Sequence, residues 1–431
     1  MDEYLLHYIW QSRHFNFKDL STTDGQQLQI LDNGKLNTDQ GPDFLFAKVR
    51  IEDMLMVGHI ELHVLSSDWV SHGHSGDPHY RNVILHVVWK DDRHVPLPFP
   101  TLELQSRVAK FSIDQYRHLK STNNKIPCER LLQNSILDIF SSFSRMLVIE
   151  RLTQRSKDIE RKLNELKGDW EQLAWRKMAH YLGGEKNGDA MEILLGSIPF
   201  NVIQACASRR IQIEALLFGQ AGFLNPGLSE SYPKKLLNEY FFLKKKFQLV
   251  QPRVEWMFFR MRPSHFPTIG IAKLSALIHS GEKLMSCILS EHQIEKMRYI
   301  MSKPLSTYWE DHYHFGKQTR LKTRKLGNTR IDNIIINVIS PMLFSYGTYH
   351  NLNVFKERAE ELLCQLKGEE NHITNTMKSV GFVNETAFHS QALIQLHKMY
   401  CIPKRCLSCQ IGISLLRPQE KSNPVVFDDG F

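Results

Sequence analysis

The chain has 431 residues, which is too long for one ordinary domain, so two or three domains are expected. Apolar residues make up 42% and charged residues 23%, proportions that are normal for a soluble globular protein with a sizeable core. The net charge of +8 mildly favours anionic partners such as nucleic acid, but it excludes no other class of partner.

Cysteine usage and hydropathy indicate the compartment. Seven cysteines in this length do not make a disulfide framework. Four of them stand singly in the sequence: Cys128, Cys206, Cys287 and Cys364. The first residues carry acids where a secretory signal carries lysine or arginine, and no window approaches about 18 uninterrupted apolar residues. We therefore expect a soluble protein of a reducing compartment, the cytoplasm, with no membrane partner.

The first quarter of the chain predicts one helix followed by a strand meander. Apolar side chains in residues 2–14 recur at helical spacing. Short β-type runs follow, with turn signals between them. The predicted strands are 27–31, 44–51, 59–64, 83–89 and 102–105. This order predicts an α/β (α+β) domain over residues 1–125.

From about residue 133 the strand pattern disappears and helical periodicity takes over. We predict an all-helical region over 133–418, which could divide into two subdomains. Its predicted helices are 134–166, 170–182, 189–195, 211–218, 232–248, 271–279, 292–302, 331–346, 354–366 and 386–399. Residues 419–431 are polar and are expected to form a flexible tail.

The most specific feature of the sequence is the segment Gly58–Val64 together with Asp43, which precedes it. Because side chains alternate along a strand, Glu61 and His63 project from one face. Asp43 begins the preceding strand, and antiparallel pairing would bring it next to Glu61. Two carboxylates at one strand crossing suit a hard divalent cation such as Mg²⁺ or Mn²⁺. The alternative is a polar-faced strand with a surface acid and histidine.

This constellation resembles the PD-(D/E)XK nuclease superfamily, whose motif is an acid after proline and then (D/E)-x-K on the next strand. Pro42-Asp43 matches the first part, Glu61 matches the second acid, and Glu3 matches the acid often carried on the first helix. His63 stands where the lysine belongs; that lysine helps to position the attacking water and to stabilise negative charge. A histidine could ligate metal or act as a base, or it could mark an inactive site. The resemblance covers about the first 110 residues.

A histidine-rich loop follows these strands. Asp68 is expected to be the N-cap of a short helix. His72 and His74 are candidate ligands for metal or phosphate at the mouth of the site. A solvated loop that happens to be rich in histidine is the alternative. A zinc site of His72, His74 and Asp77 fits no standard structural spacing.

Over nearly its whole length the chain is similar to a bacterial family, domain of unknown function 2851. The segments that carry this resemblance are GPDF at 41–44, GHIELHV at 58–64, SSDW at 66–69, NVILHVVW at 82–89, EALLFGQAG at 214–222, RPSHFPT at 262–268 and YCIPKRCLSCQIG at 400–412. The resemblance implies a two-part architecture and carries no established activity.

Three cysteines near the C-terminus form a C-x4-C-x2-C motif: Cys401, Cys406 and Cys409. Three thiolates this close could hold zinc or part of an iron–sulfur cluster, which needs four ligands. His397, one turn earlier, or Cys364 could supply the fourth ligand. The alternative is a group of buried thiols that caps the helical region.

A basic stretch between Asp311 and Asp332 contains no intervening acid, and aromatic residues precede it. Cations beside aromatic rings suit phosphate contacts and base stacking. The candidate nucleic-acid contacts are Lys317, Arg320, Lys322, Arg324 and Lys325. A solvated basic loop is the alternative.

The sequence carries no P-loop, dinucleotide fingerprint or nucleophile elbow, which disfavours NTPase, Rossmann oxidoreductase and α/β-hydrolase functions. The expected function is metal-dependent hydrolysis of DNA or RNA. Asp43 and Glu61 would hold Mg²⁺ or Mn²⁺, and His63 would orient or deprotonate the attacking water. The alternatives are a non-catalytic nucleic-acid-binding or scaffold protein with a nuclease-like fold, and a hydrolase of a smaller phosphorylated substrate.

Overall fold

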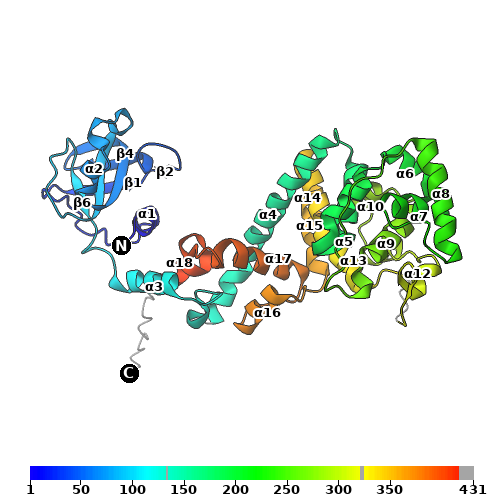
Figure 1. The fold of residues 1–431 in the computed structure, drawn as a ribbon. Helices are drawn as coiled ribbons and strands as arrows, with labels where there is room; N and C mark the ends of the chain where they lie inside the picture. Colours follow the sequence, from blue (N-terminus) through cyan, green and yellow to red (C-terminus); the bar gives the residue numbers. More distant parts are fainter. Residues whose placement is uncertain (133, 321–324, 417–431) are drawn as a thin grey trace, which may run out of the picture. The chain divides into compact units, whose positions relative to one another are not determined.

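The computed structural model describes residues 1–132, 134–320 and 325–416 and divides the chain into two compact units (Figure 1). Unit 1 consists of Met1–Phe143 together with the chain from Leu396 onward, and unit 2 is Ser144–Gln395. A sheet-containing N-terminal region followed by a mostly helical chain is confirmed. The predicted tail, 419–431, lies outside the described residues.

The division of the chain differs from the predicted boundary between residues 125 and 133. It falls within helix α4 (Asn134–Glu165), and the C-terminal segment belongs to the N-terminal unit. The physical reason is packing of α18 (Gln410–Leu416) on α3 (Lys110–Ser121), where Ser112 Oγ donates to the Leu416 carbonyl at 2.7 Å. Figure 1 draws these two helices, red and cyan, beside each other. The spacing of apolar residues along a helix cannot predict that the C-terminal segment packs against a helix of the N-terminal unit.

The core of unit 1 is a mixed sheet in the order β1-β3-β4-β5-β6, with β2 paired to β3. Its strands are β1 (Leu28–Asp32), β2 (Lys35–Leu36), β3 (Phe44–Ile51), β4 (Met54–Leu65), β5 (Val83–Lys90) and β6 (Thr101–Glu103). Antiparallel pairing joins β1 to β3 and β3 to β4, whereas β4, β5 and β6 run parallel. The predicted strands therefore all fall on observed ones, although β4 begins earlier than expected.

Helix α1 (Glu3–Gln11) packs its apolar side on β4. Its start is fixed by Asp2, whose side chain accepts from the Leu5 N–H at 2.8 Å. Strand β4 is buried on both faces, because Ile60 and Leu62 are fully buried and the polar Glu61 and His63 are also buried. The polar face of this strand is thus an interior surface, where charged groups need partners.

Short elements complete unit 1. They are α2 (Asp68–Ser71), the 3₁₀ turns His74–Gly76, Pro78–Tyr80, Glu129–Leu131 and Cys406–Ser408, and the π-helical turn His397–Cys401. The Tyr4 hydroxyl lies 3.1 Å from Ser408 Oγ, which ties α1 to the C-terminal segment.

Unit 2 is a bundle of helices with one small hairpin. Its helices are α5 (Trp170–Gly196), α6 (Phe200–Ala207), α7 (Arg210–Gln220), α8 (Ser231–Phe247), α9 (Pro267–His279), α10 (Leu284–Ser290), α11 (Ile294–Met301), α12 (Tyr308–Asp311), α13 (Asn328–Ile334), α14 (Ser340–Tyr349), α15 (Asn353–Gln365), α16 (His372–Ser379) and α17 (Ala387–Leu396). A π-helical turn, Ile335–Ile339, joins α13 to α14, and the hairpin pairs β7 (His312–His314) with β8 (Lys317–Gln318). This hairpin departs from the all-helical expectation.

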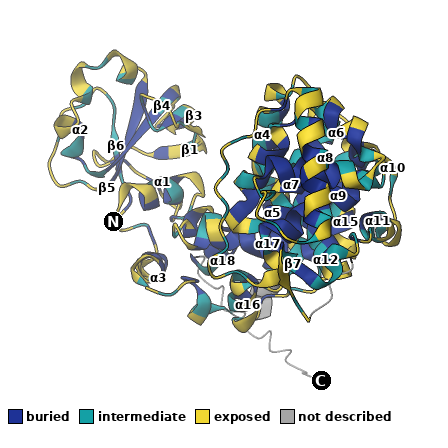
Figure 2. Cartoon of the chain, turned by 45° about the vertical axis from the view of Figure 1, so that its right-hand side comes forward, coloured by how far each residue is buried: buried dark blue, intermediate teal, exposed yellow. Residues whose placement is uncertain are grey.

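Helices α5, α7 and α9 form the centre of unit 2, and Figure 2 draws them mostly as buried. The two helices predicted at 170–182 and 189–195 share the label α5, but the backbone is non-helical at Gly184, with φ of +66°, so a kink separates two helical segments as the sequence predicted. Among the described residues no single helix is long and apolar enough to cross a membrane. Only the bent pair α5 and α6, at 89° to each other, meets the length and composition requirement jointly.

Candidate metal centre

The start of β3 and the middle of β4 bring the two predicted carboxylates together. Phe44 pairs with Ile60 in the antiparallel register, so Asp43 lies opposite Glu61. The Asp43 N–H donates to Glu61 Oε2 at 3.0 Å, and the Leu62 N–H donates to Asp43 Oδ2 at 2.9 Å. Each carboxylate is therefore positioned by the backbone of the opposite strand.

Two imidazoles lie near one oxygen of Glu61, and a third lies beside them. Glu61 Oε1 lies 3.3 Å from His74 Nε2 and 3.6 Å from His63 Nε2. His63 Nε2 in turn lies 3.2 Å from His72 Nδ1, and the three histidines each offer a nitrogen within 4.8 Å of the others. We call Glu61, His63, His72 and His74 the imidazole set.

The loop after β4 delivers two of these histidines. Gly73, between His72 and His74, has φ of +76°, a left-handed conformation that lets the chain turn sharply between the two rings. The Tyr80 ring stacks on His74 with centroids 3.9 Å apart, and the buried Trp69 packs against His74 at 5.3 Å. The aromatic rings thus fix His74 and cover the site.

His63 is held from behind by His86 of β5. His63 Nδ1 lies 2.8 Å from His86 Nε2, and both side chains are almost fully buried. When the proton of His63 sits on Nδ1 and is donated to His86, the lone pair of His63 Nε2 points at the other members of the imidazole set. A second imidazole that fixes the tautomer of the first is a common arrangement behind metal ligands.

A second group of donors involves helix α1. Glu3, His7 and Asp43 each offer one atom within 4.8 Å of the others, and His7 Nε2 lies 3.1 Å from Asp43 Oδ2. Glu3 and His7 are four residues apart on α1 and share one face. We call these three residues the acidic set. Sequence reasoning found Glu3 but missed His7, although the i, i+4 spacing was a usable signal.

The pKa values of the site residues are shifted because their side chains are buried and, among the described residues, have no lysine or arginine partner. Burial raises the pKa of Glu61 to about 9, and Asp43 and Glu3 contribute to the rise. Burial lowers the pKa of His63 to about 2 and that of His86 to about 4, and neighbouring imidazoles add to both shifts. A nearby cation would favour the ionised carboxylates and the neutral imidazoles together.

The site contains few groups that could neutralise its acids. Within the described residues, the ion-pair partners of Asp43 and Glu61 are histidines, not lysine or arginine. Asp68 does not add a free ligand, because its carboxylate accepts from the Leu65 N–H at 2.9 Å. It is also the first residue of α2 and not the expected N-cap, which is Ser67.

Several buried ring nitrogens of the site have no hydrogen-bond partner in the part of the chain that the structure describes: His7 Nε2, His74 Nε2 and His86 Nδ1. The contacts of His7 and His74 to carboxylate oxygens, at 3.1 and 3.3 Å, thus lack hydrogen-bond geometry. Buried polar atoms rarely remain unsatisfied, so these nitrogens indicate a missing partner.

The donor geometry fits a metal ion. In a tetrahedral site with metal–nitrogen bonds of about 2.0–2.1 Å, neighbouring ligand atoms lie about 3.3 Å apart. Three separations in the imidazole set are close to that value: 3.2 Å for His63–His72, 3.3 Å for His74–Glu61 and 3.6 Å for His63–Glu61. The three histidine donors all lie within 4.8 Å of one another, whereas Glu61 lies beside only two of them, His63 and His74. Three imidazoles and one carboxylate suit a transition metal such as Zn²⁺, whereas the acidic set offers more of the oxygen donors that Mg²⁺ or Mn²⁺ prefers.

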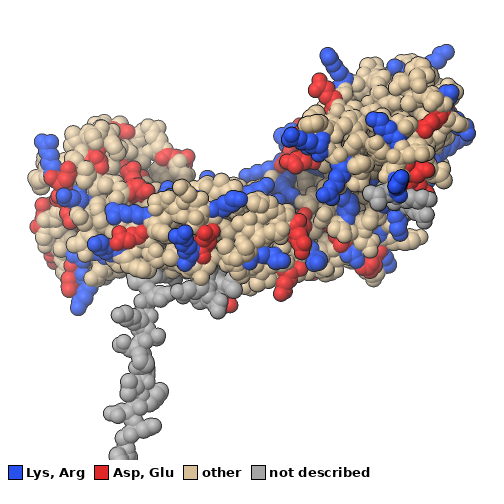
Figure 3. Space-filling model, turned by 60° about the horizontal axis from the view of Figure 1, so that its bottom comes forward, with Lys and Arg blue, Asp and Glu red and all other residues tan. Residues whose placement is uncertain are grey.

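The basic stretch proposed to contact nucleic acid lies in unit 2. Lys317, Arg320 and Lys325 are exposed, and Lys322 and Arg324 lie outside the described residues. On the face of the molecule that Figure 3 shows, lysine and arginine side chains are interspersed with acids. The net positive charge is therefore not concentrated on that face.

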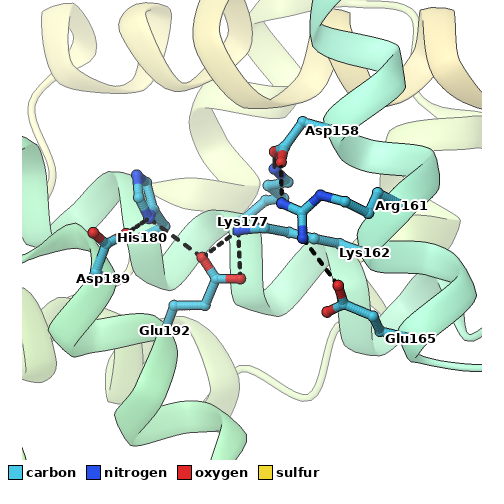
Figure 4. Close-up of polar contacts among 8 residues, drawn as sticks. All are labelled: Asp158, Arg161, Lys162, Glu165, Lys177, His180, Asp189 and Glu192. Atoms are coloured by element: carbon cyan, nitrogen blue, oxygen red, sulfur yellow. Dashed lines mark hydrogen bonds and ion pairs between the residues drawn. The ribbon is translucent and has the colours of Figure 1, made fainter.

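A second histidine–carboxylate cluster lies on α4 and α5 in unit 2 (Figure 4). His180 Nδ1 lies 3.5 Å from Asp189 Oδ1 and 3.3 Å from Glu192 Oε2. Glu192 also accepts two contacts of 2.7 Å from Lys162 Nζ, and Figure 4 shows Lys177 and Lys162 beside it. Lys162 therefore places a positive charge beside the carboxylate of Glu192 in this cluster.

Unit 2 also contains a cavity of about 830 Å³ bordered by α5, α6, α9 and α10. Its acids have structural roles. Asp169 accepts from the Gln172 N–H and caps α5, and Glu171 accepts from the backbone of Leu284 and Met285 at the start of α10. The cavity therefore offers no group of converging ligands comparable to unit 1.

The C-terminal cysteines are buried and belong to unit 1, whereas the alternative to a metal site assigned them to the helical region. Cys364, one of the two expected fourth ligands, lies exposed on α15 of unit 2. Cys401 ends a π-helical turn, and Cys406 and Cys409 follow in the segment that leads into α18.

Comparison with protein-family models matches residues 3–372 to the model described as "Protein of unknown function (DUF2851)". Comparisons with curated proteins and with solved structures gave no match. The matched range contains every member of the imidazole and acidic sets and ends before the C-terminal cysteines.

Proposed function

The chain belongs to the DUF2851 family of proteins of unknown function, and for this member we propose a metal-dependent hydrolase that cleaves phosphodiester bonds of nucleic acid. The observation that carries the proposal is the convergence of buried carboxylates and imidazoles at the start of β3 and the middle of β4. Convergent donors without a lysine or arginine partner are the arrangement that metal-dependent hydrolases use.

The order of the elements supports the phosphodiester substrate through the nuclease resemblance. Helix α1 is followed by the antiparallel strands β1, β3 and β4, and then by β5 parallel to β4. Asp43 precedes β3, and Glu61 lies on β4, so both acids occupy the motif positions of the PD-(D/E)XK pattern. The net charge of +8 also favours an anionic substrate such as nucleic acid.

The chemistry of the proposed reaction divides between the ion and the protein. A bound divalent metal would polarise a phosphoryl oxygen and lower the pKa of a coordinated water. The protein's contribution is to hold its ligands. The backbone N–H groups of Asp43 and Leu62 orient the two carboxylates, and His86 sets the tautomer of His63.

We assign His63 the role of a ligand and not that of the general base. Its side chain is only 1% exposed, and both of its nitrogens already face other imidazoles. A base must reach the proton of the attacking water, and a ring enclosed in this way cannot approach substrate. His72 is the exposed member of the imidazole set and is better placed to contact substrate or solvent.

The second candidate function is a non-catalytic nucleic-acid-binding protein that retains a nuclease-like site. The specific observation behind it is His63 itself, because this position lacks the lysine that stabilises negative charge in the superfamily. A metal held there would then serve structure and not turnover.

The proposal is tested by cleavage of labelled single- and double-stranded DNA and RNA with Mg²⁺, Mn²⁺ or Zn²⁺. We expect metal-dependent cleavage by the wild type and a loss of about 100-fold or more in Asp43→Asn and in Glu61→Gln. Asp189→Asn is the matched control, because Asp189 is an acid beside a histidine in unit 2 and is 94% exposed.

The possible results of the cleavage experiment distinguish the two candidate functions. Cleavage that is lost in both site variants and kept in Asp189→Asn supports the hydrolase. Tight nucleic-acid binding without cleavage under any of the three metals favours the second candidate. Equal cleavage by Glu61→Gln and the wild type would place the activity elsewhere or in a contaminant.

A further inference from the structure

Four of the seven cysteines lie together in unit 1, although they come from separate parts of the chain. We call them the cysteine set: Cys128, Cys401, Cys406 and Cys409. All four are buried, with 7–9% of their surface exposed. The other three cysteines lie in unit 2, and all seven are free thiols.

The members of the cysteine set are close enough to influence one another. Burial raises the pKa of the Cys128 thiol to about 12, and the neighbouring Cys409 and Cys406 add to the rise. Burial likewise raises the pKa of Cys401 well above its ordinary value, and Cys128, Cys409 and Cys406 contribute. Cys128 is therefore a further candidate for the fourth ligand beside His397, which is also buried in unit 1, whereas Cys364 lies in unit 2.

The backbone around the cysteine set is tightly arranged. A Cβ on Gly412 would lie 2.2 Å from the Cys406 carbonyl oxygen, so only glycine allows α18 to approach this segment. Burial raises the pKa of Cys409, whereas hydrogen bonds from the backbone of Gly412 and Ile411 lower it.

The surroundings place the cysteine set at the junction between the two ends of the chain. Lys404 Nζ donates to the Lys120 carbonyl at 2.7 Å, which connects the loop after Cys401 to the end of α3. Tyr4 on α1 contacts Ser408 between Cys406 and Cys409. A group bound here would fasten the returning segment to the N-terminal part of unit 1.

The distances between the sulfur atoms help to distinguish a single zinc ion from an iron–sulfur cluster. A single zinc ion with Zn–S bonds of about 2.3 Å places its sulfurs about 3.8 Å apart. Among the described residues, the donor groups that lie within 4.8 Å of one another do not include three of these thiols. A wider core, as in an iron–sulfur cluster, accommodates this arrangement. C-x4-C-x2-C followed by a fourth cysteine is a known iron–sulfur spacing, and here the fourth cysteine, Cys128, precedes the motif instead.

We propose that the cysteine set binds an iron–sulfur cluster, which fastens the C-terminal segment of unit 1 to its N-terminal part. Each thiol gives up its proton as its sulfur bonds to iron, so binding of a cluster requires no electron transfer. The proposal is independent of the hydrolase function, because it rests on other residues and is read out without activity.

The test is anaerobic purification of the full chain, followed by incubation with ferric and ferrous iron and sulfide, so that the ferric iron of a cluster is supplied without a further oxidant. Iron, acid-labile sulfide and zinc are measured together with visible absorption. We expect iron and sulfide in cluster stoichiometry, and loss of both in Cys128→Ser and Cys406→Ser. Cys364→Ser is the matched control and is expected to retain the cluster.

Several results would overturn the proposal. Wild-type protein without iron after incubation would do so, and this result does not depend on the folding of any variant. One zinc per chain with no iron would also overturn the cluster. Retention of iron and sulfide by a folded Cys128→Ser protein would remove Cys128 from the ligand set.

Discussion

Two histidine–carboxylate clusters, one in each unit, offer donors at similar separations but differ in their countercharges. Glu61 in unit 1 faces His63 and His74, whereas Glu192 in unit 2 faces His180 and also Lys162. Burial disfavours the charged form of both glutamates. For Glu61 burial together with the nearby Asp43 raises the pKa to about 9. For Glu192 the hydrogen bonds from His180 and Lys162 outweigh burial and bring the pKa to about 2.

The comparison teaches that proximity of histidines and acids does not by itself identify a metal site. The unit 2 cluster is a satisfied ion-pair network, and its exposed members cost little to leave in water. The unit 1 cluster is buried and lacks basic partners, so a cation would relieve both the carboxylate repulsion and the unsatisfied imidazoles. The predictions below separate the two clusters experimentally.

The largest difference is expected in metal affinity. His63→Ala should weaken binding of Zn²⁺ or Mn²⁺ by about 100-fold or more, because it removes a central ligand and leaves Glu61 without one of its neighbours. His180→Ala, the matched substitution in unit 2, should leave the affinity unchanged. Isothermal titration of metal-free full-length protein measures both. An equal loss of metal affinity in His63→Ala and His180→Ala would contradict the proposed difference between the two clusters.

A smaller effect is expected on the stability of unit 2. Glu192→Gln removes the carboxylate that pairs with Lys162, and we expect a loss of about 1–2 kcal/mol in the free energy of unfolding. Denaturant unfolding followed by circular dichroism measures it. Glu165→Gln is the control, since its partner Arg161 is exposed and the pair is worth little.

The pH dependence of this network follows from its low pKa values. Glu192 and Asp158 both have pKa values near 2, below their ordinary values of 4.5 and 3.8. Their contribution to stability is therefore complete above about pH 4.5 and is lost as the pH falls toward 2. Thermal unfolding between these pH values should show a steeper loss in the wild type than in Glu192→Gln. Parallel profiles would contradict the ion-pair assignment.

The smallest effect concerns the basic stretch of unit 2. Lys317→Ala and Arg320→Ala should each weaken nucleic-acid binding by roughly two- to threefold and reduce the salt dependence by about one charge if they touch phosphate. Fluorescence anisotropy at several salt concentrations measures this. Lys245→Ala on α8 serves as a control for nonspecific charge loss, and equal effects of all three would indicate no specific contact.

The sequence predicted those parts of the site that depend on local pattern. Alternation along Phe44–Ile51 and around Glu61 gave the strands, and hairpin register then placed Asp43 beside Glu61. His7 was missed because its role depends on the packing of α1 on β4. No role for His86 could be assigned from the sequence, because its contact with His63 depends on the parallel register of β5.

The limits of local pattern are clearest at the C-terminus. Cys128 and Cys401 lie more than half the chain apart, and no periodicity connects them. Their proximity depends on α18 packing against α3, a contact that only the folded chain reveals. In unit 2 a local signal was sufficient, since the break predicted between residues 182 and 189 coincides with the kink at Gly184.

The most direct test of the central claim is anomalous X-ray diffraction from crystals of the full chain grown or soaked with Zn²⁺ or Mn²⁺. We predict an anomalous peak within bonding distance of Glu61 Oε1 and His63 Nε2 and none beside Glu192. A peak beside His180 and Glu192 with the imidazole set empty, or no peak at either cluster, would contradict the account.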